Sequence, residues 1–209
     1  MPKIIEGHDI SGFIDHDYEK VEKLSIDGKI DWFEYRFNKI LLNPIERIDT
    51  IVKKDIEKKD ECFLENQDVS VFTIIVLTVC VGIDVLGGFL SGKEKDAVER
   101  DFEYFVENYL DSENSYSETP HGDIAEYAIL LYKLFRCGLA HNLTIKKIGF
   151  CYGELYFRKE SGNYYISVDR LLKDLGQAFD NYMRDVRRNK NGLQQKFMSR
   201  FSYVFIERV

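Results

Sequence analysis

The chain has 209 residues, of which 44% are hydrophobic and 14% aromatic, and its formal net charge is −7 at pH 7. This length and apolar content suffice for one well-buried core, and they exclude a linker or tail protein. The acidic balance argues against a protein that coats nucleic acid over its whole surface. We therefore expect one domain over residues 1–209.

The cysteines and the N-terminal residues indicate a reducing, cytoplasmic location. None of the cysteines is spaced as C-x-x-C, and two of them lie in apolar segments where a reduced thiol packs well; the four are Cys62, Cys80, Cys137 and Cys151. The stretch from Met1 to Asp9 lacks the apolar core of a signal peptide and carries acidic residues early. We expect a cytoplasmic protein without a disulfide framework.

The first predicted helix is long and amphipathic and begins near Asp31. Its apolar residues recur mostly at steps of three and four, which marks one side of a helix: they are Phe33, Phe37, Ile40, Leu41, Ile45, Ile48, Val52 and Ile56. Pro44 is expected to kink this helix or divide it in two, because proline lacks a backbone N–H. Residues 1–30 precede it as an N-terminal extension.

The second predicted helix is the apolar run from Val69 to Leu90. Its uncharged portion ends at Ile83, short of the roughly 20 residues that a bilayer requires, so we expect a buried core helix and no membrane association. Asp84 is the one charge in this run, and a buried carboxylate is costly unless it is paired. Arg136 is the preferred partner; alternatively, Asp84 lies at a helix end and contacts water.

A third helix is predicted from about Lys93 to Leu110, followed by a polar loop over residues 111–122 and a helix that ends near His141. The next two segments, Ile148 to Phe157 and Tyr164 to Val168, are aromatic and β-branched with a turn between them, which predicts a hairpin. These elements indicate a mainly α-helical fold, an up-and-down helical bundle with a short inserted β-hairpin.

A last long helix is predicted from Val168 to about Arg188, and residues 189–209 form a basic and aromatic C-terminal tail. The pattern of this tail fits a helix or a strand equally. Basic side chains mixed with aromatic rings are typical of single-strand binding; the residues for weak RNA contacts are Arg184, Arg187, Arg188, Lys196 and Arg200. The alternative, which we favour, is a segment that packs on the domain or on a partner chain.

The main candidates for chemistry are Arg136 and His141, which lie five positions apart at the end of an apolar helix. An arginine presents a planar fork suited to phosphate oxygens, and a histidine transfers protons near neutral pH. On a regular α-helix five residues turn by about 500°, so the two side chains would point roughly 140° apart. Convergence needs a locally unwound helix near Gly138 or a second copy of the chain. Alternatively, Arg136 pairs with Asp84, His141 caps the helix, and both are architectural.

This pattern, an arginine and a histidine separated by four residues after a Leu-Tyr-x-x-Phe run, resembles the HEPN superfamily. From about Trp32 to Arg188 the chain is similar to bacterial HEPN-like proteins. The resemblance implies a homodimeric, metal-independent endoribonuclease without a cofactor, part of a defence or toxin system. It implies that His141 assists proton transfer in the attack of an RNA 2′-hydroxyl on the adjacent phosphate, and that Arg136 holds the phosphate.

Two further residues have supporting roles in this interpretation, Asp84 and Asn142. The residue after the arginine is often polar in active members of the family and is Cys137 here; Asn142 is the residue that could supply polarity instead. Two other functions stay open: a non-catalytic HEPN-like module that binds a nucleotide, RNA or a protein partner, and a structural helical dimer. The other histidines show no metal-ligand spacing.

Overall fold

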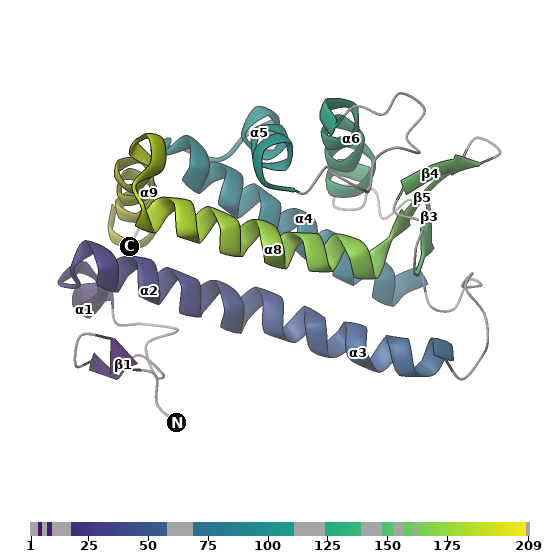
Figure 1. Ribbon diagram of the computed structural model, residues 1–209, viewed down its shortest axis with the longest axis horizontal. Coiled ribbons are helices and arrows are strands. Elements are labelled where there is room, and N and C mark those ends of the chain that lie inside the picture. The colour runs from purple at the N-terminus through teal and green to yellow at the C-terminus, as the bar shows by residue number, and fades with distance from the viewer. Residues whose placement is uncertain are drawn as a thin grey trace.

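The computed structural model describes residues 4–5, 8–9, 18–57, 69–110, 124–138, 148–152, 157–160 and 163–207, and the statements below concern these residues. They form a mainly α-helical bundle with a small sheet at one end (Figure 1). One connected hydrophobic core includes residues from Val21 to Phe201. The predicted fold class, a helical bundle with a short inserted hairpin, is confirmed.

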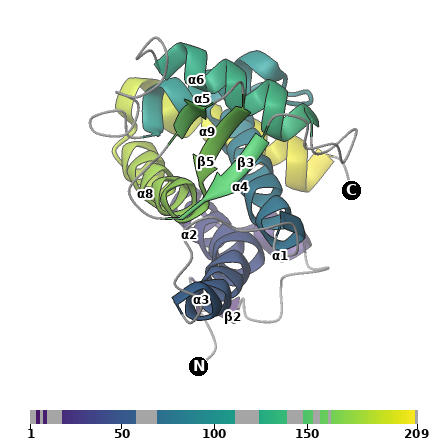
Figure 2. The same cartoon turned by 90° about the vertical axis from the view of Figure 1, so that its right-hand side faces the viewer.

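Helix α4 (Val69–Ser91) is the centre of the bundle. It contacts α5 (Glu99–Tyr109), α8 (Val168–Arg187), α9 (Leu193–Ser202) and the π-helical segment η2 (Leu131–Cys137). In the end-on view these elements surround α4 on several sides (Figure 2). Within the described ranges α4 is the one helix long and apolar enough to cross a membrane, but its packing explains its composition. The prediction of a central, buried helix is confirmed.

The first long helix is divided at the predicted proline. Helix α2 (Ile26–Phe37) continues through a π-helical turn, η1 (Asn38–Leu42), into α3 (Asn43–Glu57), and the three form one long rod (Figure 1). Pro44 has no N–H to donate to the carbonyl of Ile40, so the α-helical pattern is interrupted just before it. The helix begins earlier than predicted, because the Ser25 hydroxyl accepts a hydrogen bond from the Gly28 N–H at 3.0 Å and caps α2.

Part of the predicted N-terminal extension belongs to the core. Before α2 lie the two-residue strands β1 (Ile4–Ile5) and β2 (His8–Asp9), which pair antiparallel, and the short helix α1 (Tyr18–Glu22). Val21, Leu24 and Ile30 are buried in the common core. The chain from α1 onward is therefore an integral part of the bundle.

The small sheet lies between the motif helix, which is α6 (Ile124–Leu130) continued by η2, and α8. Strands β4 (Phe157–Glu160) and β5 (Asn163–Ser167) pair antiparallel, so a hairpin is present, but β4 begins at the last residue of the predicted first strand and reaches into the predicted turn. The predicted first strand contains β3 (Ile148–Cys151), and its predicted antiparallel pairing is wrong, because β3 pairs parallel with the other edge of β5. Its residue Phe150 is buried against Phe72 and Phe135, and this burial fixes β3 over the helices.

The C-terminal segment is helical and packs on the domain, which decides between the alternatives left open by its sequence. After α8 the chain turns through three residues of positive φ and a short 3₁₀ turn, η3 (Lys190–Gly192), into α9 and the π-helical η4 (Tyr203–Glu207). Phe197 and Phe201 are fully buried, and Phe197 contacts the rings of Phe33 and Phe89. The predicted tail therefore packs on the domain through Leu193, Phe197 and Phe201, which are part of the core.

Candidate functional site

The candidate site lies where η2 crosses α4. The Nε of Arg136 donates a hydrogen bond to Oδ2 of Asp84 at 2.7 Å, which confirms the predicted pairing. The guanidinium also lies 5.7 Å from the centre of the Tyr132 ring. The side chain of Arg136 is 31% exposed and that of Asp84 is 18% exposed. The pair is therefore accessible on one side rather than enclosed in the core.

Arg136 uses one edge of its guanidinium for this pair. Within the described part of the chain, its single hydrogen bond is the one from Nε to Asp84, and the two terminal nitrogens have no acceptor. A guanidinium that uses Nε for a carboxylate still presents two terminal NH₂ groups in its plane. Asp84 thus fixes the arginine, and no other described residue accepts a hydrogen bond from its outer edge, which is the edge that suits an anion.

Burial and the contact between the two groups shift the pKa values of Asp84 and Arg136. Burial raises the pKa of the Asp84 carboxyl, and the hydrogen bond and charge of Arg136 offset part of this. The hydrogen bond to Asp84 in turn raises the pKa of Arg136. Burial also raises the pKa of the Tyr132 hydroxyl and, strongly, that of the Cys80 thiol beneath the pair. Arg136 is consequently the fixed cation of the site, and Cys80 is a neutral packing residue.

The motif helix is not a regular α-helix at this point. Residues 131–137 form a π-helix, in which hydrogen bonds join residues five apart, and the N–H of Gly138 still reaches the carbonyl of Lys133. Tyr132 and Cys137, five apart, accordingly lie against each other. The helix is therefore irregular just before Gly138, and the wide turn places residues five apart within it on one face. His141 and Asn142 lie outside the described residues.

The predicted weak RNA contacts do not form one surface. Arg200 is only 8% exposed, and its Nη1 donates to the backbone carbonyls of Lys93, at 3.0 Å, and Lys95, so its guanidinium serves the packing of α9. Arg187 is bound by two carboxylates of α2, those of Asp31 and Glu34. The remaining three are exposed; they are Arg184, which donates to the Asn181 side chain, Arg188 and Lys196. The prediction that Arg200 contacts RNA is corrected by its burial.

Sequence reasoning missed a polar cluster that lies between α3 and α8. Asp49 on α3 is buried, accepts hydrogen bonds from the Tyr152 hydroxyl and from the Lys53 ammonium at 3.0 Å, and borders a pocket. The four-residue spacing of Asp49 and Lys53 was a signal for an ion pair on one helix face. Nothing in the sequence joined them to α8.

Comparison of the chain with protein-family models, curated proteins and solved structures finds no match. In the described ranges, no group of three or more histidine, cysteine, aspartate or glutamate side chains is placed to hold a metal ion.

The raised pKa of Asp84 predicts a specific pH dependence of stability. Because the folded state holds this proton more tightly than the unfolded state, whose value is near 3.8, stability is lost as the pH rises through the raised folded pKa. Asp84→Asn removes the titration. We expect the wild type to lose free energy of unfolding relative to Asp84→Asn between about pH 4 and 7, measured by urea unfolding across this range. If the difference in free energy of unfolding between the two proteins stays constant with pH, or changes in the wild type's favour as the pH rises, the pKa of Asp84 is not raised by folding.

Proposed function

We propose that this protein is a HEPN-like, metal-independent endoribonuclease in which Arg136 binds the scissile phosphate. The observation that carries the proposal is the state of Arg136: its Nε is fixed by Asp84, its outer edge is uncommitted among the described residues, and its side chain is partly exposed. A structural ion pair would be buried and saturated with hydrogen bonds. An arginine fixed on one side and open on the other is suited to a phosphate.

The proposed reaction needs one cation and one proton carrier. The 2′-hydroxyl oxygen of RNA attacks the adjacent phosphorus, the bond from phosphorus to the 5′-oxygen breaks, and a cyclic phosphate and a 5′-hydroxyl result. Arg136 stabilises the charge that develops on the phosphate oxygens. His141 takes the proton from the 2′-hydroxyl or returns one to the leaving oxygen. In this proposal Asp84 positions Arg136, and Asn142 supplies a polar group beside the histidine.

The π-helical turn supports this pairing of residues. The spacing from Arg136 to His141 is five, which is the hydrogen-bonded repeat of the turn that ends at Gly138. Such turns occur frequently at functional sites, because they re-aim side chains within a helix.

We further propose a two-fold homodimer whose interface includes the motif helix and the outer face of α4. Val81 and Val85 on α4 flank Asp84 and are 46% and 36% exposed, and Ile129 on α6 is 38% exposed. Exposed apolar side chains on the helices that carry a candidate site suit an isologous interface in which each copy completes the other's cleft. As part of this proposal we assign the enzyme to the cytoplasm and to a defence or toxin system.

The dimer is tested by sedimentation at micromolar protein concentration. We expect a dimer for the wild type and a dimer dissociation constant raised at least about tenfold for Val85→Lys, because a lysine at the interface must lose its hydration. Ile51→Lys is the matched control, since Ile51 is a 63% exposed apolar residue on α3; it should leave the dimer intact. A wild-type monomer, or equal effects of the two lysines, would remove the composite site.

The direct test of the proposed function is cleavage of RNA in the presence of a chelator. Cleavage by the wild type that depends on Arg136 and His141 supports the proposal. A folded, dimeric protein that cleaves no RNA would instead favour the non-catalytic binding module.

A further inference from the structure

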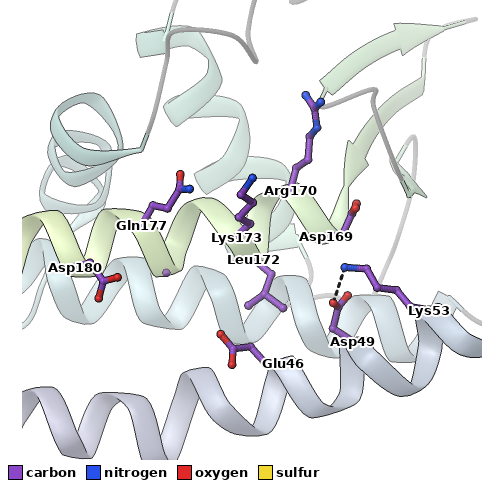
Figure 3. Close-up of a pocket in the computed structure, with 10 residues that line it drawn as sticks. Glu46, Asp49, Lys53, Asp169, Arg170, Leu172, Lys173, Gln177 and Asp180 are labelled. Atoms are coloured by element: carbon purple, nitrogen blue, oxygen red, sulfur yellow. Dashed lines mark ion pairs between the residues drawn. The ribbon is translucent and has the colours of Figure 1, made fainter.

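A second site lies away from Arg136, in a pocket of about 580 Å³ between α3 and α8. Three of its lining residues come from α3 and seven from α8: Glu46, Asp49, Lys53, Asp169, Arg170, Leu172, Lys173, Gly176, Gln177 and Asp180. The two helices run in opposite directions along this pocket (Figure 3). Its volume is in the range of pockets that enclose small molecules.

One end of the pocket is closed by the cluster around Asp49. Its carboxylate accepts from the Tyr152 hydroxyl and from Lys53, and the Lys53 ammonium lies 5.4 Å from the centre of the Tyr152 ring. Burial raises the pKa of Asp49, and Lys53 counteracts this. Asp169 accepts a hydrogen bond from the Ser167 hydroxyl at 2.7 Å. These contacts make a fixed wall.

The remaining polar side chains of the pocket are uncommitted. In the part of the chain that the structure describes, five of them make no hydrogen bond or ion pair through their side chains: Glu46, Arg170, Lys173, Gln177 and Asp180. Arg170 lies at the end near Lys53, Asp180 lies at the other end, and Glu46 and Lys173 lie between them on opposite walls (Figure 3). Lys173 and Asp180 are seven residues apart on one helix face, a separation of about 10 Å. Among these five side chains, the cations Arg170 and Lys173 lie nearer the Lys53 end and Asp180 lies at the other end; the Lys53 end also holds the carboxylates of Asp49 and Asp169, which are engaged by Lys53, Tyr152 and Ser167.

The glycine in the wall of this pocket is the observation that points to a ligand. Gly176 lies in the middle of α8, where glycine is about 1 kcal/mol less favourable than alanine. Packing does not require it, because no described atom lies within 4 Å of the position that a Cβ would take. A helix-interior glycine that opens onto a pocket allows close approach of a bound molecule to the backbone.

We propose that this pocket binds a small, elongated molecule with an anionic group at one end and amino groups at the other. Arg170 and Lys173 bind the phosphate or carboxylate by charge-assisted hydrogen bonds. The carboxylates of Asp180 and Glu46 accept hydrogen bonds from the amino groups. The amide of Gln177 can donate to the anionic group or accept from an amino group. Leu172 and Gly176 form the floor against which the middle of the molecule lies. Nucleotides with amino-bearing bases and linear amino acids share this chemistry.

Calorimetric titration of the full chain with two matched pairs of probes tests the proposal. Adenosine monophosphate is compared with inosine monophosphate, which lacks the exocyclic amine, and 6-aminohexanoate is compared with hexanoate. We expect the amine-bearing member of one pair to bind at least about tenfold more tightly than its counterpart, since one lost charge-assisted hydrogen bond has an effect of this size. The responding pair identifies the source. Equal binding of both members in each pair, or no binding of any probe, overturns the proposal.

Variants locate the binding. Gly176→Leu fills the pocket and should weaken binding at least about tenfold without lowering the melting temperature, because it removes a glycine from a helix. Asp180→Asn should reduce the preference for the amine-bearing probe. Arg170→Ala should weaken the binding of both probes of the responding pair. Arg188→Ala, an exposed arginine at the end of α8, is the matched control. Arg136→Ala should leave binding unchanged; loss of binding in that variant with retention in Gly176→Leu would assign the probe to the Arg136 site and overturn the pocket.

Discussion

His141→Ala and Arg136→Ala should each lower the rate of RNA cleavage by about a hundredfold or more. The first removes the group that moves the proton, and the second removes the fixed cation that stabilises the charged phosphate. Arg136→Lys should recover little of the lost cleavage rate. The single ammonium of a lysine cannot both donate to Asp84, as the Arg136 Nε does, and present two further nitrogen donors to the phosphate. Chelator should leave the wild-type rate unchanged, and DNA should resist cleavage because it lacks the 2′-hydroxyl.

The control for this experiment is another surface arginine in an ion pair. Arg100 on α5 lies 3.4 Å from Glu103 and 3.3 Å from Glu107, and its side chain is 66% exposed. Arg100→Ala should cleave RNA at the wild-type rate, and circular dichroism should show that all variants are folded. Cleavage that persists in His141→Ala, or that stops with chelator, would rule out the proposed mechanism.

The same substitution at two helix glycines should change stability in opposite directions. Gly87 on α4 lies against α5: a Cβ there would overlap the backbone carbonyl of Asp101, with its carbon atom at 2.7 Å. Gly87→Ala must push the two helices apart, and we expect a loss of about 2 kcal/mol or more in the free energy of unfolding. In Gly176→Ala the new Cβ has no described atom within 4 Å. This variant should therefore raise the free energy of unfolding by about 1 kcal/mol.

Urea unfolding of the two variants beside the wild type measures this contrast. Both changes add one methyl group to a helix interior, so intrinsic helix propensity predicts stabilisation in each case. Only tertiary contact separates them. Stabilisation by Gly87→Ala would show that α4 and α5 do not approach as closely as described, and destabilisation by Gly176→Ala would show that the pocket wall is packed.

The sequence by itself determined the local features of this protein. The length and single charge of the run from Val69 predicted a core helix with a paired Asp84, because an apolar helix must be buried and a buried carboxylate needs a partner. The aromatic, β-branched segments predicted strands where β3 and β5 lie, because alternation and turn residues are local signals. Pro44 marked the interruption between α2 and α3, since a missing N–H acts within one turn.

Only the tertiary structure decided the features that depend on distant segments. The placement of β3 beside β5 follows from the burial of Phe150 on the helices, which a strand pattern does not contain. The π-helical turn at Arg136 shows in its hydrogen bonds and not in residue types. Arg200 had the sequence pattern of a surface cation, but in the structure it is buried and donates hydrogen bonds to backbone carbonyls of residues more than a hundred positions earlier. The pocket of α3 and α8 arises in the same way, because its two walls are far apart in the chain and meet only when both helices pack around the core.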